Sequence, residues 1–425
     1  MKKIICFILI VLFMLTALLA CTSGEGESAP GTSSYDGGVS SLPEVTDDPS
    51  DGASDTGPDS SSGITPDIST GDTSDISADD MSDTDASGTS SDVTDTSDIS
   101  ADDMSDTDAS GTSSDVTDTS EPPDTDEGYE VNGLLISGTM GMEMFYGSTS
   151  CAESYSAVLG KFRSRLSDDI RIYSLVVPHA SSYYAPSNYS YLLDYGKRAF
   201  DTLTANLPDG VIYVDVYNTL KEHLDEPIYP RTEHHWNALG AFYAAREMCS
   251  LAGISLPGLE QFEKQTQSGF VGSLYTLYKA DILKNNPEDF VFYVPTNTYT
   301  AKFYNKGNYD LSSPNMTRSS CLFDLSGSTS GKYATFLAAD DYFVHIETGN
   351  SSGRNLVIFK DSYGNALAPF YAASGFDNIY FCDIRTFALN GPEFAESVGA
   401  TDVMFAVSGF TACGPVYSYI EGLLS

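Results

Sequence analysis

Basic residues are scarce in this chain of 425 residues, which has 21 Lys and Arg against 60 Asp and Glu. The segment 22–127 contains no basic residue and 29 of the acidic ones. Residues 128–425 have 19 basic and 31 acidic side chains, a formal net charge of −12. Most of the total charge of −39 therefore belongs to one segment, and we expect no nucleic-acid partner.

Long hydrophobic runs are also missing. The run ICFILIVLFMLTALLA follows Lys2 and Lys3 and has about 16 residues, whereas a membrane-spanning helix needs ~20. A basic start and a short apolar run are typical of a secretory signal. The sequence LLAC ending at Cys21 resembles a bacterial lipobox, which predicts a lipoprotein-type signal peptide over 1–21 and lipidation of Cys21. Cleavage without lipid and an uncleaved anchor are the alternatives, and all three export the chain to the outer face of the membrane or beyond.

Large apolar residues are nearly absent from 22–127, so this segment cannot bury a core and is predicted to be a disordered, extended linker. It has low complexity, and a 23-residue sequence, TSDISADDMSDTDASGTSSDVTD, occupies 73–95 and recurs over 96–118. The repeat lacks a hydrophobic face for stacking, and the spacing of an EF-hand is missing. We interpret the linker as an acidic stalk.

Closely spaced cysteine pairs are missing too. Five cysteines follow the signal, with wide spacings and no CxxC: Cys151, Cys249, Cys321, Cys382 and Cys413. This excludes a zinc knuckle and a dithiol redox motif, and an odd number leaves at least one thiol unpaired. No cofactor motif is present, and we expect no cofactor.

What remains, 128–425, alternates helical and apolar β-type segments, as in a parallel sheet covered by helices. Helices are predicted over 154–166, 188–207, 237–252, 363–374 and 393–400, and strands over 171–178, 211–216, 355–359, 378–384 and 402–408. Residues from about 256 to 352 are aromatic, short-segmented and rich in turns, which indicates a β-rich insertion or strands at the sheet edge. The fold prediction is a three-layer α/β domain with a mostly parallel sheet.

In NLVIFKDSYGNAL, Ser362 stands just past an apolar strand and at the start of a helix. Open α/β sheets bind ligands at this edge, and a helix start offers unpaired N–H groups that can hold an oxyanion. The sequence is not the GxSxG elbow of the α/β-hydrolases. The alternative is that Asp361 or Ser362 only caps the helix.

A nucleophilic serine needs a base and an orienting acid, and RTEHHWNAL offers both. Glu233 and His235 stand two residues apart before a helix, so Glu233 can grip one ring nitrogen of His235 while His234 points elsewhere. A structural role for the His pair is the alternative. A metal is not expected, because the HExxH spacing is absent and adjacent histidines do not easily share one ion.

The motifs TEHHWNALGAFYAA, FKDSYGNALAPFYA and CDIR, in this order, resemble the bacterial DHHW family over about 133–425. That family is similar to the alginate O-acetylation proteins, which have an SGNH-hydrolase-like domain. The resemblance implies Ser362 as nucleophile, His235 as base and Glu233 in the place of the family's Asp, with the order acid, His, Ser. It also implies a polysaccharide acceptor and a membrane-bound partner that supplies acetyl groups. The backbone N–H of Ser362 is the expected oxyanion donor.

Four further residues are candidates for substrate binding because they lie near the same sheet edge: His179, His234, Tyr363 and Arg385. For Arg385, whose guanidinium suits carboxylates or phosphates, an ordinary salt bridge is the alternative.

The function predicted is an exported SGNH-like acyltransferase that O-acetylates a surface polysaccharide. An esterase with the same triad and a catalytically silent glycan-binding or assembly module are the alternatives. An active site requires Nε2 of His235 within hydrogen-bond reach of Oγ of Ser362, with Glu233 on Nδ1.

Overall fold

The computed structural model describes residues 127–326, 329–338, 340 and 342–425. The expected signal peptide, the lipidation at Cys21 and the acidic linker up to residue 126 lie outside the described residues. Within the described part, no helix is both long and apolar enough to cross a membrane.

An eight-stranded sheet forms the centre of the fold, with the strand order β5-β4-β13-β11-β12-β10-β8-β9. The first five strands are parallel to one another and coincide with the apolar segments predicted as strands. They are β5 Val211–Val214, β4 Arg171–Val177, β13 Asp402–Ser408, β11 Asn355–Lys360 and β12 Asn378–Asp383. The structure is therefore a mixed α/β fold with a large, mostly parallel sheet, as predicted.

The β-rich section 256–352 forms both structures that its sequence indicates, which are strands at the edge of the main sheet and a separate β-rich insertion. Three antiparallel strands extend the main sheet beyond β12: β10 Tyr342–Glu347, β8 Thr300–Asn305 and β9 Met316–Ser319. A separate hairpin pairs β6 Glu263–Phe270 with β7 Glu288–Val294. Four short helices accompany them: η2 Leu259–Gln261, α7 Ser273–Tyr278, α8 Asp281–Lys284 and the 3₁₀ helix η3 Thr329–Thr335.

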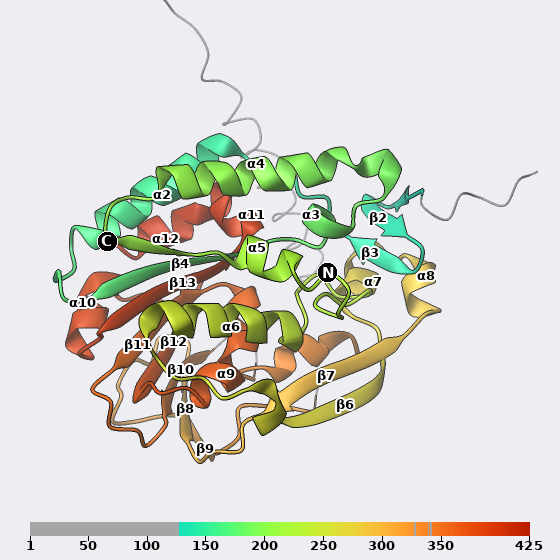
Figure 1. Ribbon diagram of the computed structural model, residues 1–425. Coiled ribbons are helices and arrows are strands. Elements are labelled where there is room, and N and C mark those ends of the chain that lie inside the picture. The colour runs from blue at the N-terminus through green and yellow to red at the C-terminus, as the bar shows by residue number, and fades with distance from the viewer. Residues whose placement is uncertain (1–126, 327–328, 339, 341) are drawn as a thin grey trace, which may run out of the picture. The chain divides into compact units, whose positions relative to one another are not determined.

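Helices cover both faces of the sheet (Figure 1). On one face α2 Thr149–Arg163 and α4 Tyr191–Asn206 pack on side chains such as Val176 and Phe359. On the other face α6 Ala238–Ala252 and α9 Ala368–Ala372 pack on the alternate side chains, such as Leu175 and Ile358. Burial on both faces explains the continuous apolar runs of the parallel strands. The remaining helices are α3 Ser181–Tyr184, η1 Ser187–Tyr189, α5 Val216–Lys221, η4 Ser362–Leu367, α10 Gly391–Ser397, α11 Gly409–Ala412, η5 Pro415–Tyr417 and α12 Ser418–Gly422.

The helix ends differ in detail from the prediction. Helix α6 ends as expected at Gly253, whose φ of +66° is a conformation that glycine adopts easily. Asn237 precedes α6, but its side chain donates to the carbonyl of Pro227 at 3.0 Å instead of capping the helix. The predicted helix 363–374 begins as the 3₁₀ helix η4 and becomes α-helical only in α9.

A small antiparallel sheet at the start of the described region was not predicted. It consists of β1 Tyr129–Val131, β2 Leu134–Ser137 and β3 Met140–Met142. The N–H of Gly141 in β3 donates to the carbonyl of Arg231 at 2.9 Å. This bond fixes the small sheet to the segment that contains the two adjacent histidines.

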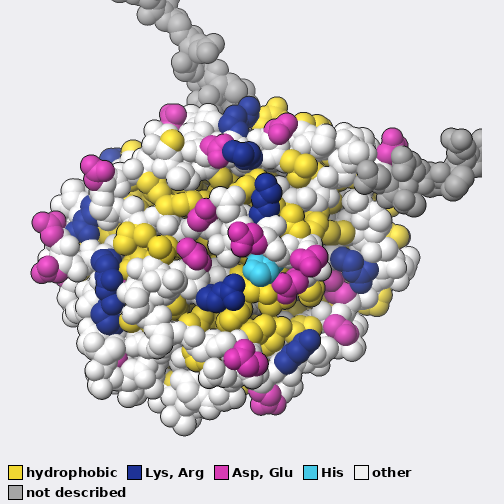
Figure 2. All heavy atoms as spheres, in the orientation of Figure 1, with side chains coloured by type: hydrophobic (Ala, Val, Ile, Leu, Met, Phe, Trp, Pro, Cys, Tyr) yellow, Lys and Arg dark blue, Asp and Glu magenta, His cyan; other side chains and the backbone are white. Residues whose placement is uncertain are grey.

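Charges of both signs are interspersed on the face of the molecule seen in Figure 2. That face has no large patch of either sign, which agrees with the modest charge of 128–425.

Below the surface, Cys249, Cys382 and Cys413 are buried free thiols, and burial raises the pKa of Cys249 and Cys413 to about 12. These thiols are therefore unreactive at neutral pH.

Candidate active site

Ser362 begins η4 directly after the central strand β11, which has parallel neighbours on both sides. The preceding Asp361 caps η4, because its Oδ1 accepts the N–H of Tyr363 at 3.0 Å. Its Oδ2 accepts the N–H of Ser408 and the hydroxyl of Thr411, both at 2.8 Å. Asp361 therefore takes the capping role that the sequence left open, and the hydroxyl of Ser362 is available for another partner.

That partner is His235, whose Nε2 lies 2.8 Å from Oγ of Ser362. On the other side of the ring, Nδ1 of His235 lies 2.8 Å from Oε1 of Glu233. Glu233 and His235 are both buried, whereas Ser362 is partly exposed. The structure thus brings together the three residues singled out from the sequence, in the geometry of an acid, a base and a nucleophile.

Ser273 at the start of α7 holds the carboxylate of Glu233. Its N–H donates to Oε2 at 2.8 Å and its hydroxyl donates to Oε1 at 2.5 Å. Burial alone would raise the pKa of Glu233, but hydrogen bonds and charge from His235, His234 and Ser273 lower it to about 2. Glu233 is therefore ionised at neutral pH and can orient His235.

The backbone before Ser273 passes very close to the Glu233 segment. A Cβ added at Gly272 would lie 2.6 Å from the carbonyl oxygen of Thr232 and 2.7 Å from Cβ of Glu233. The N–H of Gly272 donates to Oγ of Thr232 at 2.9 Å, and that hydroxyl donates to Glu288 at 2.6 Å. Position 272 therefore requires glycine for close approach.

The ring of His235 is held between aromatic side chains. It stacks on Tyr333 with ring centroids 3.7 Å apart and an interplanar angle of 0°, and Tyr363 lies at 4.8 Å. The Nε1–H of Trp236 and the hydroxyl of Tyr333 both donate to the carbonyl of Tyr363, at 2.9 and 3.1 Å. The single tryptophan of the chain therefore ties the segment of His235 to η4, the helix that begins with Ser362.

A chain of hydrogen bonds links His179 to the same place. The N–H of Phe410 donates to Nε2 of His179 at 3.0 Å, so the proton of a neutral His179 is on Nδ1. Nδ1 then donates to the hydroxyl of Tyr363 at 3.0 Å, and this hydroxyl donates to the carbonyl of His234 at 2.5 Å. Burial lowers the pKa of His179 well below its usual value, which keeps the ring neutral.

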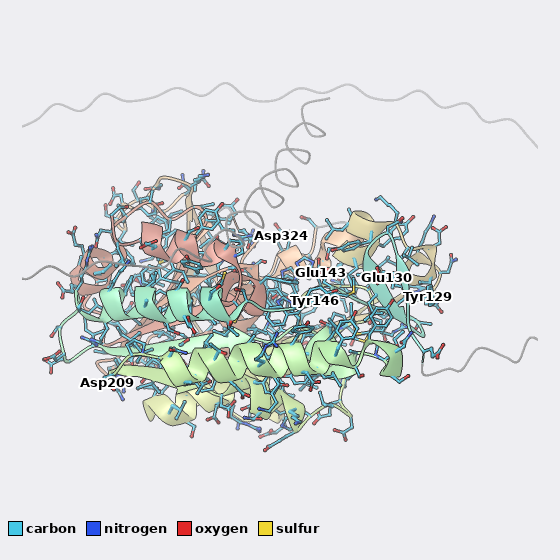
Figure 3. All side chains as sticks on the ribbon, turned by 90° about the horizontal axis from the view of Figure 1, so that it is seen from above. Tyr129, Glu130, Glu143, Tyr146, Asp209 and Asp324 are labelled. Carbon is cyan, nitrogen blue, oxygen red and sulfur yellow. The ribbon has the colours of Figure 1, made fainter. Side chains whose placement is uncertain are left out.

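A pocket of about 170 Å³ opens beside Ser362. Its lining combines the triad with residues of the α7 start, η3 and η4: Glu233, His235, Ser273, Gly331, Tyr333, Ala334, Asp340, Ser362 and Asn365. The four residues proposed from the sequence for substrate binding do not line this pocket. His179 and His234 line a small neighbouring cavity with Glu143, which Figure 3 labels.

The four residues support the lining instead. His234 lies with its Nδ1 2.6 Å from Oγ of Ser273, and burial is the main cause that lowers its pKa to about 4. Tyr363 is buried under His235. Arg385 donates to Asp383 at 2.6 and 2.8 Å and lies 2.9 Å from Asp340, so it has the salt-bridge role that was the alternative.

Glu233, His234 and His235 also offer ligand atoms within 4.8 Å of one another. Of the described residues, they form the group that could hold a metal ion. Nδ1 of His235 and Oε1 of Glu233 already bond to each other, however, and Nδ1 of His234 contacts Ser273. A metal bound through these atoms would break the contact that orients His235.

Sequence reasoning missed Ser273, Tyr333, Asp340 and Asn365 as parts of the site. Only Gly272 and Ser273 had a sequence signal, in the stretch GSLY, because a Gly-Ser pair before an apolar helix suits a close approach followed by a helix start. Tyr333 and Asp340 lie in an irregular section with no periodic pattern, so nothing local indicated that they reach the pocket.

The sequence model of the DHHW protein family matches residues 72–382, which include Glu233, His235 and Ser362. No curated protein matches the sequence.

Among solved structures, a DHHW family protein from Eubacterium siraeum is 35% identical, with a TM-score of 0.64, over 69% of this chain and 97% of its own. PatB1 from Bacillus cereus matches at 16% identity and a TM-score of 0.53, over 69% of this chain and 99% of its own, which shows a similar fold. The O-acetyltransferase domain of Pseudomonas putida AlgJ matches over 69% of this chain and 96% of its own at 12% identity, but its TM-score of 0.35 supports no argument about the site. By both the sequence model and the first of these structures, the chain belongs to the DHHW family.

Proposed function

We propose that the chain is a serine-dependent acyltransferase with an SGNH-hydrolase-like domain, which O-acetylates a polysaccharide at the cell surface. The observation that carries the proposal is the line of contacts from Glu233 through His235 to Ser362, with both distances at 2.8 Å. Such a line activates a hydroxyl for attack on an acyl carbonyl.

In the first half of the reaction, Nε2 of His235 takes the proton from Oγ of Ser362 as Oγ attacks the carbonyl carbon of an acetyl donor. The ionised Glu233 keeps the proton of the neutral ring on Nδ1 and stabilises the imidazolium that forms. The N–H of Ser362 at the first position of η4 has no partner within that helix and suits the developing oxyanion. The leaving group then takes the proton from His235, and the acetyl group remains as an ester on Ser362.

In the second half, His235 removes a proton from a sugar hydroxyl as its oxygen attacks the ester carbonyl, and His235 then returns the proton to Oγ of Ser362 as the bond between Oγ and the acetyl group breaks. Attack by water on the same ester gives acetate and makes the protein an esterase. The partly exposed position of Ser362 beside an open pocket supports access for an acceptor. The acceptor is the point on which transferase and esterase differ.

The setting of this activity is part of the proposal. The N-terminal signal ending at Cys21 favours an exported, lipid-anchored protein on the outer face of the membrane, and the acidic segment 22–127 favours a spacer that holds the domain away from it. The resemblance of the family to the alginate O-acetylation proteins implies a membrane-bound partner that would supply the acetyl group.

The test uses the full chain with 4-nitrophenyl acetate, release of 4-nitrophenol as the rate, and mass spectrometry to detect an acetyl adduct. We expect a burst of product and an adduct that maps to Ser362, both lost in Ser362→Ala and His235→Ala. Ser408→Ala is the matched control, because Ser408 also ends a parallel strand but its hydroxyl caps α11. Equal rates in all four proteins would overturn the acyltransferase and favour a silent glycan-binding module.

Treatment with a chelator distinguishes the serine mechanism from a mechanism that uses a metal ion held by Glu233, His234 and His235. We expect the burst to be unchanged after treatment with EDTA. Loss of the burst, restored by added Zn²⁺, would contradict the proposed roles.

A further inference from the structure

One part of the pocket wall consists of polar side chains with no role in activating Ser362. Asp340 and Asn365 form this wall, and Asn365 stands one helical turn after Ser362 in η4. An acceptor that reaches Ser362 through the pocket comes close to this wall, so the chemistry of the wall affects which acceptors bind.

Asp340 presents a carboxylate to the pocket. Its Oδ1 accepts Nδ2 of Asn365 at 2.7 Å and lies 3.4 Å from Nζ of Lys360, and its Oδ2 lies 2.9 Å from Arg385. The side chain is still 36% exposed. Asp340 therefore has a fixed position and an accessible negative charge.

The two cations that hold Asp340 do not reach the pocket. Lys360 is 1% exposed and donates to Asp383 at 2.7 Å, and Arg385 grips the same Asp383. Of the described residues that line the pocket, none is Lys or Arg. Lys332 stands between two lining residues of η3 without lining the pocket itself. Asp340 thus lines the pocket, whereas Lys360 is buried and Arg385, although 36% exposed, lies outside the lining.

Asn365 holds the carboxylate of Asp340 in place. Its amide must turn Nδ2 toward this carboxylate, because the opposite orientation would place two acceptor oxygens together. Asn365 itself is 1% exposed, and its Oδ1 is buried. The accessible polar group of this wall is therefore the carboxylate of Asp340, which accepts hydrogen bonds and repels anions.

We propose that Asp340, held by Asn365, determines acceptor specificity: the pocket takes a glycan that donates hydrogen bonds through hydroxyl or ammonium groups, and rejects one with a carboxylate. Neutral sugars and amino sugars fit this description, whereas uronic acids do not. The inference rests on the proposed function in one respect, because it assumes that the acceptor reaches Ser362 through this pocket.

The test measures binding, so that it does not depend on catalysis. The full chain with Ser362→Ala is titrated with three matched tetrasaccharides, built from glucosamine, glucose and a uronic acid. We expect the uronic acid tetramer to bind about tenfold or more weakly than the glucosamine tetramer, with glucose between them. The difference should shrink as salt is raised, because an exposed charge is screened.

The substitution Asp340→Asn should remove most of the difference in affinity between the three tetramers, whereas Asp324→Asn should leave that difference unchanged. Asp324, labelled in Figure 3, is a matched control because its side chain is 39% exposed and pairs with Arg318 away from the pocket lining. Equal or tighter binding of the uronic acid tetramer to the Ser362→Ala chain would overturn the proposal, even if Asp340→Asn fails to fold. Unchanged ordering in a folded Asp340→Asn would also overturn it.

The proposed function and this inference fail in different ways. A chain that forms no acyl ester but binds the three tetramers in the expected order retains the acceptor specificity and loses the catalytic role. A chain that forms the ester on Ser362 but prefers the uronic acid tetramer retains catalysis and loses the role of Asp340.

Discussion

Glu233 shows at the scale of one residue why this chain can have Glu where the family's motif has Asp. Its longer side chain turns back to its own segment, where Oε1 accepts the N–H of His234 at 3.0 Å and faces Nδ1 of His235 at 2.8 Å. It also reaches Ser273 with both oxygens. The extra methylene lets the carboxylate of Glu233 contact His234, His235 and Ser273 at the same time, whereas a shorter carboxylate could not make all of these contacts at once.

We therefore predict that Glu233→Gln lowers the rate of ester formation by about a hundredfold to ten thousandfold, because a neutral amide does not stabilise the imidazolium. Glu233→Asp should retain more activity than Glu233→Gln, since it keeps the charge. The rate of the 4-nitrophenol burst measures both. Glu226→Gln is the control, because Glu226 pairs with His223 at 2.7 Å outside the pocket and its loss should leave the burst unchanged. Equal bursts in Glu233→Gln and the unaltered chain would show that the carboxylate does not orient the base.

Tyr363 is the second residue whose hydroxyl matters. Tyr363→Phe would leave the Nδ1–H of His179 and the carbonyl of His234 without their shared partner, at a cost of about 1–3 kcal/mol in unfolding free energy. We expect a lower kcat with little change in KM, because the base shifts while the pocket lining stays in place. Tyr371→Phe is the matched control, since this buried hydroxyl contacts only a thioether, Sδ of Met404 at 3.4 Å. A larger loss of kcat in the control than in Tyr363→Phe would contradict the positioning role.

At the scale of elements, the start of α7 is positioned by the absence of a side chain at Gly272. Gly272→Ala would push α7 away from Thr232 and Glu233, which separates Ser273 from the acid. We expect the acyl-ester burst to fall about tenfold or more and the melting temperature to fall by several degrees. Gly160→Ala is the control, because its Cβ would meet Pro208 at an ordinary 3.5 Å inside α2 and alanine favours a helix. A Gly272→Ala protein whose acyl-ester burst equals that of the unaltered chain would show that the site does not need the close approach of residue 272 to Thr232 and Glu233.

The main elements could be predicted from the sequence because their signals are local. Apolar runs mark the parallel strands, Gly253 marks the end of α6, and a serine after a strand marks a sheet edge that binds ligands. The pairing of His235 with Ser362 joins residues 127 apart in sequence, so it followed from the family resemblance and not from any spacing.

The parts that could not be predicted depend on contacts between distant segments. The short strands β1 to β3 have few residues each and are fixed by a bond from Gly141 to Arg231. Tyr333 stacks on His235 from a 3₁₀ segment without periodicity. In both cases tertiary packing, not local propensity, determines the structure.

At the scale of the whole molecule, two histidines with lowered pKa values link stability to pH. Burial lowers the pKa of His179 well below 6.5 and is the main cause that lowers that of His234 to about 4. The unfolded chain binds protons at these positions near pH 6.5, and the folded chain does not. The unfolding free energy must therefore fall as pH falls from about 6.5 toward 4, by at most about 1.4 kcal/mol per pH unit for each histidine.

Urea denaturation of the full chain at pH 7.5, 6.0 and 5.0 measures this slope. His234→Asn should reduce the slope, because it removes one of the two sites that take up a proton on unfolding. Glu233 contributes in a lower window, since its folded pKa of about 2 gives stability that is present above about pH 4.5 and lost as pH falls further. A free energy of unfolding that is constant from pH 7.5 to 5.0 would contradict the neutral state of both histidines in the folded chain.

The strand order also determines at which stage of synthesis by the ribosome the site can form. Strand β4 pairs on one side with β13, the last strand of the sheet, and β13 separates β4 from β11, which carries the serine. A ribosome that has made Glu233, His235 and even Ser362 has not yet made residues 402–408, so the two halves of the sheet still lack the strand that joins them. The contact between His235 and Ser362 can therefore form only after residues 402–408 have been made, and a chain interrupted before β13 should form no acyl ester.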